Sequence, residues 1–379
     1  MDLKNTLFRW SRGLLFLVLL LSGISSAQAV NCKVGEGESA PKSFTVPLAG
    51  HFYAGNDLPV GSVIYETLVT MSGRVGVYCD AAFNVDGEFR VTNEPAGAPF
   101  TQAGTSFTGQ IYPTNVPGVG VALIDRNAGL AFTKSAPEAL PGYWVLNEAG
   151  PKDMVGSHFA LALIKTGNIT SGGTVYGSSL PSMALNAVAK PGYSGLPINN
   201  IWTVNFTGNL FLDTSTCTTP GNPTYDLGKF SPEDFPYVGS KSQNFDVPIH
   251  LTNCPVFTGY YSEGGRQQST DSASPSGGTL KNNMLEMTVT PSAGYYSDGT
   301  QMKLNNVSGS ASGLAFLLYH HLEGETTLSR ISSGQVMYQT MSLERSGDVY
   351  IPFVVQLRRI GDLRPGKING SFTVTINYK

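Results

Sequence analysis

The stretch that decides the fold is residues 371–379, SFTVTINYK, at the end of the sequence. Its apolar side chains occupy every second position: Phe372, Val374, Ile376 and Tyr378. Successive side chains of a β-strand point to opposite faces of a sheet, so this alternation predicts a strand with one buried and one exposed face.

The same period-two alternation recurs along the whole chain, and no segment sustains a helical period. Gly (44 residues) is abundant, and only 13% of the residues are charged, which is too few for long helices of Glu, Lys and Leu. The composition therefore predicts an all-β protein with a β-sandwich in each half. Further predicted strands contain Phe44, Val46 and Leu48; Val75, Val77 and Cys79; Phe245, Val247, Ile249 and Leu251; and Ile351, Phe353, Val355 and Leu357.

The first residues are typical of an export signal. Lys4, Arg9 and Arg12 precede an apolar run at 14–21, and small residues up to Ala29 form a signal-peptidase site. Residues 1–29 are therefore predicted to be a signal peptide, and the run is too short to span a bilayer. The formal net charge of -3 argues against a nucleic-acid partner.

Four cysteines divide the chain into two parts. Export favours oxidation, and local pairing predicts the disulfides Cys32–Cys79 and Cys217–Cys254. On the chain-entropy model each would stabilise its domain by roughly 3–4 kcal/mol. One bridge in each half, with a polar stretch just before Cys217, predicts one domain at 30–212 and a second at 213–379.

The C-terminal sequence resembles the pilin domains of the chaperone-usher pathway. The resemblance rests on the alternating last strand with its penultimate aromatic, on Gly366 before it, on Cys217 and Cys254, and on the stretches at 312–316 and 351–357. It implies an incomplete immunoglobulin-like sandwich that lacks its last strand and takes one from another chain. A periplasmic chaperone would lend that strand first, and the next fimbrial subunit would then replace it.

In that case the implied contacts of the chaperone and the donor strand are Phe372, Val374, Ile376 and Tyr378, with the Lys379 carboxylate as anchor and Gly366 as part of the motif. The alternative is that these side chains fill a closed core. In the predicted mature chain only Val30 and Asn31 precede Cys32, so we expect no arm that could be donated onward. Such a subunit would stand at the tip of the fibre.

The N-terminal half is similar to the lectin-like domains of type 1 and type 3 fimbrial adhesins, which also begin with a cysteine paired about 40–50 residues later. The strand at 201–212 resembles the one that closes those domains. Mannose-binding members begin with an aromatic residue where this chain has Val30, which speaks against mannose. By position, the resemblance implies a sugar pocket formed by Asp80, Asn84 and Asp86 with Thr166 and Asn168. The alternative is that these polar residues simply make turns.

Two aromatic residues, Tyr143 and Trp144, are further candidates, because aromatic faces stack on sugars and collagen-like peptides. A tryptophan in a sandwich is more often part of the core. The stretch at 125–127, Asp-Arg-Asn, would either bind a carboxylate or form a turn. Neither the histidines nor the cysteines have metal-ligand spacing, and no nucleophile elbow or phosphate loop occurs. We therefore expect no enzyme activity, no metal and no cofactor.

Taken together, these resemblances imply a fimbrial tip adhesin that attaches bacteria to a host surface glycan or matrix protein. Its other partners would be a periplasmic chaperone, the outer-membrane usher and the next subunit, and its location would be the fimbrium tip on the cell surface. The alternative is a structural tip or adaptor subunit that binds no receptor.

Overall fold

A computed structural model describes residues 29–34, 41–55, 57–189, 194–195, 198–259, 266–269, 281–321, 327–341 and 346–379. The predicted signal peptide lies outside these residues, except for Ala29. Within them the only helical segments are two 3-10 turns, Gly177–Ser179 and Pro232–Asp234. None of the described helices reaches the length and apolarity that a membrane crossing requires. The predicted all-β class is confirmed.

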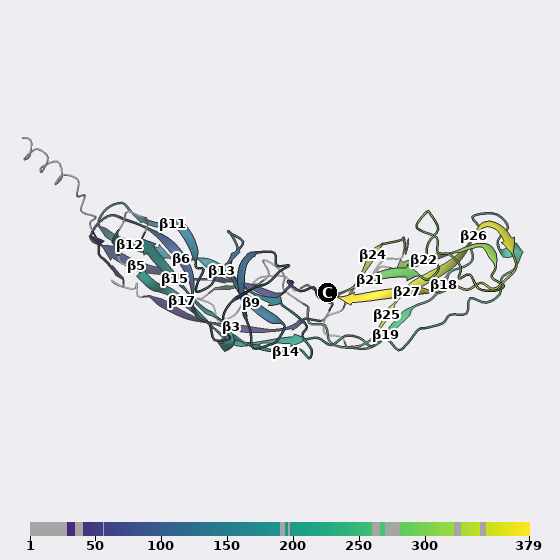
Figure 1. Cartoon of the computed structure of the whole chain (residues 1–379), viewed down its shortest axis with the longest axis horizontal. Coiled ribbons are helices and arrows are strands. Elements are labelled where there is room, and N and C mark those ends of the chain that lie inside the picture. The colour runs from purple at the N-terminus through teal and green to yellow at the C-terminus, as the bar shows by residue number, and fades with distance from the viewer. Residues whose placement is uncertain are drawn as a thin grey trace, which may run out of the picture.

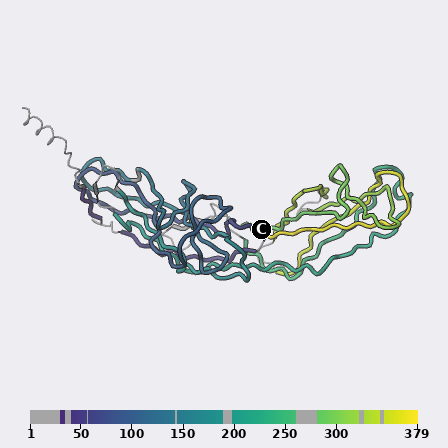
Figure 2. The backbone as a smooth tube through the Cα atoms, in the orientation of Figure 1, coloured from purple at the N-terminus to yellow at the C-terminus, as the bar shows by residue number. Residues whose placement is uncertain are grey.

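The chain forms two elongated bodies that lie end to end (Figures 1 and 2). One hydrophobic cluster is built from side chains between Val30 and Leu212. A second is built from side chains between Cys217 and Tyr378, joined by Tyr53 from the first body. We call the residues up to 212 the N-terminal half and those from 213 on the C-terminal half.

Two large sheets form most of the N-terminal half, and their buried faces enclose Phe89, Phe132 and Phe159, which pack with ring centroids 5.2–6.1 Å apart. A smaller sheet and one strand pair stand at the end remote from the C-terminal half (Figure 1). The seven-stranded sheet has the order β20 (Arg266–Ser269), β4 (Val63–Thr70), β13 (His158–Lys165), β9 (Val119–Asp125), β10 (Leu130–Ala131), β8 (Thr108–Pro113) and β7 (Phe100–Thr101). Its edge strand β20 comes from the C-terminal half and pairs in parallel with β4. The six-stranded sheet has the order β11 (Glu138–Leu146), β6 (Phe83–Asn93), β15 (Ser182–Ala189), β17 (Ile198–Asp213) and β14 (Gly173–Tyr176), with β3 (Lys42–Tyr53) paired to β17. The smaller pairings join β12 (Gly150–Val155), β5 (Arg74–Cys79) and β2 (Cys32–Val34), and join β1 (Ala29–Val30) to β16 (Ser194–Gly195).

Strand β17 runs along the whole length of the N-terminal half. It pairs in parallel with β3 from Trp202 opposite Lys42 to Asp213 opposite Tyr53. Both strands therefore end at the junction with the C-terminal half, where the Ala54 N–H donates to the Asp213 carbonyl at 2.7 Å. The sixteen residues of β17 correspond to about 50 Å, so the two ends of this half are far apart.

Apart from β20, the described strands of the C-terminal half form three smaller sheets around Phe257, Phe316, Phe353 and their neighbours. Its strands are listed here in sheet order. The first sheet contains β18 (Phe245–Asp246), β26 (Phe353–Arg364), β22 (Ser312–His321) and β23 (Leu328–Arg330). The second joins β19 (Ile249–Cys254) to β25 (Gly347–Ile351), and the third contains β24 (Val336–Thr340), β21 (Met284–Pro291) and β27 (Phe372–Tyr378).

Both predicted disulfides are present. Cys32–Cys79 ties β2 to β5 across 47 residues, and Cys217–Cys254 ties the start of the C-terminal half to β19 across 37 residues. Each bond therefore closes within one half, as local pairing predicts.

Candidate functional sites

The outer edge of β27 has no strand beside it in the described part of the chain. Among the described strands, β27 is the last of its sheet and pairs with β21 alone. Lys379 and Met284 exchange both backbone hydrogen bonds, at 2.6 and 2.8 Å. Hydrogen-bonded pairs alternate along an antiparallel ladder, so the odd-numbered residues of β27 direct their N–H and C=O groups to β21. The N–H and C=O groups of Phe372, Val374 and Ile376 therefore point to the open edge.

The inward face of β27 is only half covered. Phe372, Val374 and Ile376 pack against the second hydrophobic cluster but remain partly exposed, while Thr373 and Thr375 are exposed. Only Tyr378, at the end next to the N-terminal half, is buried. An alternating strand in a closed sandwich would bury this whole row, so the row lacks part of its cover.

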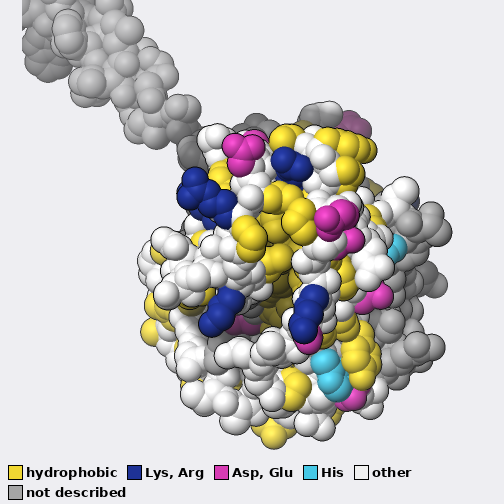
Figure 3. Space-filling model, turned by 90° about the vertical axis from the view of Figure 1, so that its right-hand side faces the viewer, with side chains coloured by type: hydrophobic (Ala, Val, Ile, Leu, Met, Phe, Trp, Pro, Cys, Tyr) yellow, Lys and Arg dark blue, Asp and Glu magenta, His cyan; other side chains and the backbone are white. Residues whose placement is uncertain are grey.

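The chain beyond Cys217 does not cover this row with a paired strand. Residues 218–231 are exposed except for Leu227 and Phe230, which are half-buried. Within the described residues this stretch has one bridge, Thr218 with Thr252, and no strand. Figures 1 and 2 show the chain after residue 217 following the margin of this half, apart from β27. The end view in Figure 3 shows hydrophobic side chains in a hollow with Lys and Arg side chains at its rim.

The other two predicted contacts at this edge have structural partners of their own. The Lys379 ammonium pairs with Glu286 on β21, and this hydrogen bond holds the pKa of Glu286 below its ordinary value, against the effect of burial. A Cβ at Gly366 would lie 2.4 Å from the Ala311 nitrogen, so Gly366 permits the close approach of two backbone segments.

In the N-terminal half, the predicted sugar pocket is not one site. Asp80 lies at the remote end, where its carboxylate accepts from the Asn31 N–H at 2.8 Å and side-chain amide at 3.2 Å. Thr166 and Asn168 follow β13, whose last residue, Lys165, donates to the Gly55 carbonyl at the junction of the two halves. The prediction that these loops meet is therefore wrong, because strand direction puts them at opposite ends of the body.

Asn84 and Asp86 do lie together, in a polar row on the outer face of β6. The row continues with Glu88 and Arg90, which the sequence analysis missed although they follow at the same period of two. Asn84 has a buried Oδ1 with no hydrogen-bond partner in the described structure, and Asp86 is half-buried. We call Asn84, Asp86, Glu88 and Arg90 the β6 polar row.

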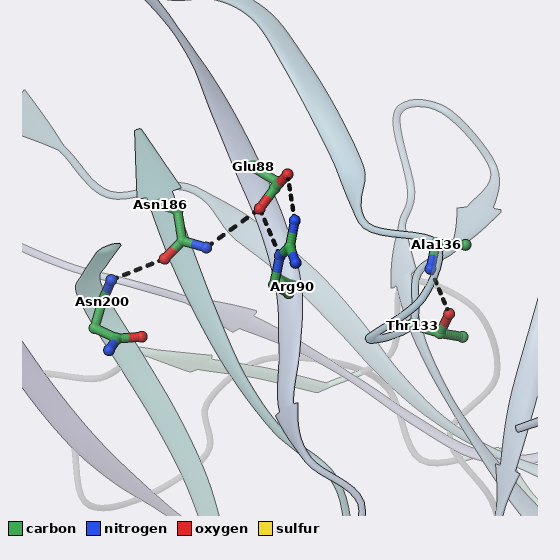
Figure 4. A network of polar contacts seen from close by, with 6 residues as sticks. All are labelled: Glu88, Arg90, Thr133, Ala136, Asn186 and Asn200. Atoms are coloured by element: carbon green, nitrogen blue, oxygen red, sulfur yellow. Dashed lines mark hydrogen bonds and ion pairs between the residues drawn. The ribbon is translucent and has the colours of Figure 1, made fainter. Parts of the chain in front are cut away.

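A network across three strands supports the β6 polar row (Figure 4). The Arg90 guanidinium donates to both Glu88 carboxylate oxygens, at 2.8 and 3.0 Å. Asn186 on β15 donates to Glu88 at 3.3 Å and accepts from the Asn200 N–H of β17 at 2.8 Å. Asn200 has a left-handed backbone with φ 57°, beside an irregularity in the β15–β17 ladder. A separate bond in the same view, from the Ala136 N–H to Thr133, closes a loop after β10.

The network favours the charged form of Glu88. Burial alone would raise the pKa of Glu88, but hydrogen bonds from Arg90 and Asn186 hold the pKa below its ordinary value. Glu88 therefore remains a carboxylate. Its side chain is 15% exposed and that of Arg90 is 45% exposed, so the guanidinium is the more accessible group of the pair. Such a surface offers donors and acceptors in fixed positions to hydroxyls or peptide groups.

The predicted aromatic pair does not form an exposed site. Trp144 is 2% exposed and stacks on Trp202 with centroids 6.3 Å apart, so it belongs to the core and the interpretation as a ligand contact is wrong. It faces inward because it pairs with the buried Val85 of β6. The side chain of Tyr143 lies outside the described residues.

The stretch at 125–127 forms a turn, as one of the two interpretations predicts. The Asp125 carboxylate accepts from the Asn127 N–H at 2.8 Å. Arg126 instead binds the buried Glu66 of β4 through two nitrogens. No group of three His, Cys, Asp or Glu side chains suited to a metal ion occurs in the described structure.

The N-terminal half matches a known family. Residues 48–183 match the model described as MrkD-like receptor binding domain. No curated protein matches the chain. The predicted resemblance to chaperone-usher tip adhesins is thus confirmed in the N-terminal half.

Several solved structures are similar at low identity. The CupB6 tip adhesin from Pseudomonas aeruginosa is 15% identical, and the match covers 92% of this chain and 94% of that one with a TM-score of 0.33. The receptor binding domain of the plasmid-born adhesin MrkD1P of Klebsiella pneumoniae is 22% identical over 49% of this chain and 98% of that one, with a TM-score of 0.31. The P pilus rod subunit PapA is 14% identical over 44% of this chain and 100% of that one, with a TM-score of 0.30.

Proposed function

We propose that this chain is the receptor-binding tip subunit of a chaperone-usher fimbrium. After a signal peptide at 1–29, residues 30–212 form the receptor-binding domain and residues 213–379 form a pilin domain that holds the adhesin on the fibre. The observation that carries the proposal is the combination, in one chain, of a segment matching a receptor-binding domain family with a last strand, β27, that has no described strand along its outer edge.

The open edge of β27 supports anchoring by strand addition. A donor strand laid along it would pair with the backbone of Phe372, Val374 and Ile376 and would cover their half-exposed side chains. Main-chain hydrogen bonds would supply affinity, and alternate side chains in the hollow would supply specificity. A periplasmic chaperone would fill the edge during export, the usher would receive the complex, and the next subunit would fill the edge in the fibre.

The β6 polar row is the proposed receptor-contact surface, with a host glycan or a matrix protein as ligand. Arg90 presents donors and Asp86 presents acceptors, the groups that vicinal hydroxyls or peptide groups require, while the Oδ1 of Asn84 is buried behind them. Asp80, Thr166 and Asn168 are not included, because their positions at opposite ends of the half prevent one ligand from reaching all of them.

The alternative, a tip subunit that binds no receptor, is separated from this proposal by a binding screen. The full chain without its signal peptide, with an alternating apolar strand fused after Lys379, would be screened against glycans and immobilised matrix proteins. We expect one ligand class to be retained, and Arg90→Ala to weaken it at least 10-fold, with Arg74→Ala on β5 as the matched control. If no ligand is retained, or if both variants bind like the parent, the assignment of the receptor or of this surface is wrong.

A further inference from the structure

The open edge of β27 ends against the N-terminal half, and the last donor on that edge is already occupied. Tyr378 pairs with Leu285 without backbone hydrogen bonds, so its N–H points outward with those of Phe372, Val374 and Ile376. It donates to the carboxylate of Asp57 at 3.1 Å. Asp57 therefore takes the place that a carbonyl of an added strand would occupy at this position.

A buried hydroxyl without a partner lies beside this contact. Tyr53 of β3 is 6% exposed and packs against Phe257 and Tyr378, with centroids 5.8 and 6.1 Å apart. Its hydroxyl has no hydrogen-bond partner among the described residues. The pKa of Tyr53 is raised, mainly by burial and then by the charges of Asp57, Tyr378 and Asp213. The carboxylates of Asp57 and Asp213 therefore lie near this phenol. The open edge of β27 thus ends beside two carboxylates and a hydroxyl that has no partner among the described residues.

A described cation close to Asp57, Lys165, is already engaged. Lys165 is 2% exposed, and its ammonium donates to the Gly55 carbonyl at 2.6 Å. Burial lowers the pKa of Lys165, while Asp57 acts in the opposite direction. Asp57 itself is exposed at the surface.

The direction of an added strand follows from which end is blocked. The N-terminal half occupies the Tyr378 end of β27, so the body of a donating subunit has to lie beyond the Phe372 end. If the donor is the N-terminal segment of that subunit, as the proposed function requires, its first residue reaches deepest. The donor then runs antiparallel to β27 and brings its N-terminus to Asp57.

We propose that the Asp57 carboxylate binds the cationic N-terminal end of the donor strand, as either an α-ammonium group or the side chain of a first Lys or Arg. The proposal rests on the proposed function and adds to it the chemistry of the strand's end. The Tyr53 hydroxyl supplies a second hydrogen-bond partner for the same cation, and the bond from Tyr378 to Asp57 keeps the carboxylate in place until the strand arrives. The N-terminal half thereby closes the Tyr378 end of the open edge of β27.

Competition between two peptides tests this site. A 13-residue alternating apolar peptide with a free N-terminus and its acetylated form, labelled at the C-terminus with different dyes, would be refolded together with a limiting amount of the full chain, disulfides intact. The ratio of bound dyes reports the preference. A third and fourth peptide, acetylated and starting with Lys or Gln, separate a side-chain ammonium from an α-ammonium.

We expect the free or Lys-first peptide to be preferred about 2- to 5-fold, the range of an accessible ion pair. The preference should fall to about 1 in Asp57→Asn and persist in Asp153→Asn, a matched substitution at the remote end of the chain. It should also shrink at 0.5 M salt in the unchanged protein. A preference of 1 throughout, or one that survives in Asp57→Asn, would overturn the role of Asp57 while leaving the open edge intact. If no peptide is taken up at all, the proposed function itself fails.

Discussion

Removing Asn186 should destabilise the N-terminal half by a predictable amount. This side chain is 4% exposed, and its Oδ1 is the acceptor for the N–H of Asn200 at 2.8 Å. Asn186→Ala leaves that N–H without its acceptor, and the Glu88 carboxylate loses the hydrogen bond that the Asn186 amide donates to it. The substitution removes two hydrogen bonds, one of them to a carboxylate, at about 1 kcal/mol each, so we expect a loss of about 2 kcal/mol in the free energy of unfolding. For a body of this size that corresponds to about 4–8 °C in Tm.

Tryptophan fluorescence during urea unfolding measures this loss, because Trp144 and Trp202 are both buried in the N-terminal half. Trp202 lies two positions from Asn200 on the same strand. The control is Asn205→Ala, an exposed amide on that strand, for which we expect a change within about 0.5 kcal/mol. Equal stability of the two variants would refute the reasoning, since it would mean that the buried amide contributes no more than a solvated one.

Two further predictions concern the C-terminal half. Burial, then the neighbouring His321, lowers the pKa of the 1% exposed His320, so the unfolded chain binds this proton more readily. Above the ordinary pKa of about 6.5 this histidine is neutral in both the folded and the unfolded chain, and its stabilising contribution is fully present. As the pH falls from there towards the pKa of the folded state, the free energy of unfolding decreases, by at most about 1.4 kcal/mol at pH 5.5. Hydrogen exchange of β22 should show this loss, and His320→Gln should reduce it; an unchanged acid response would contradict the assignment. Gly366→Ala should cost about 1–3 kcal/mol by collision with residues 309–311, whereas Gly361→Ala, with no atom within 4 Å of the added carbon, should cost little; equal melting of the two would exclude the steric argument.

The sequence predicts the strands well because their signal is local. A period of two is visible in any few residues, and it identifies β27, its inward row and the all-β class without further information. The disulfides follow for a related reason, since two distant pairs of cysteines leave local pairing as the simplest arrangement. The outward polar row on β6 was accessible in the same way, because Glu88 and Arg90 continue the alternation of Asn84 and Asp86.

The parts that the sequence does not predict depend on how distant strands are placed. Whether Asp80 and Thr166 meet is decided by the direction of β13 relative to β5, and neither residue carries that information. Trp144 faces the core because of its register against β6, which is shifted by an irregularity between Leu140 and Trp144. Asn186 joins Glu88 across two separate strands 98 residues apart in sequence. Side-chain type alone could not reveal any of these relations.

Amide hydrogen exchange at single-residue resolution along β27 tests the central claim most directly. The full chain would be compared with and without an alternating apolar strand fused after Lys379. We expect the amides of Thr373, Thr375 and Asn377, which bond to β21, to be protected in both proteins. The amides of Phe372, Val374 and Ile376 should exchange rapidly in the unfused chain and become protected only when the strand is added. Strong protection of those three amides without the added strand would mean that the edge is closed, and the account of this chain as a subunit held by a borrowed strand would be contradicted.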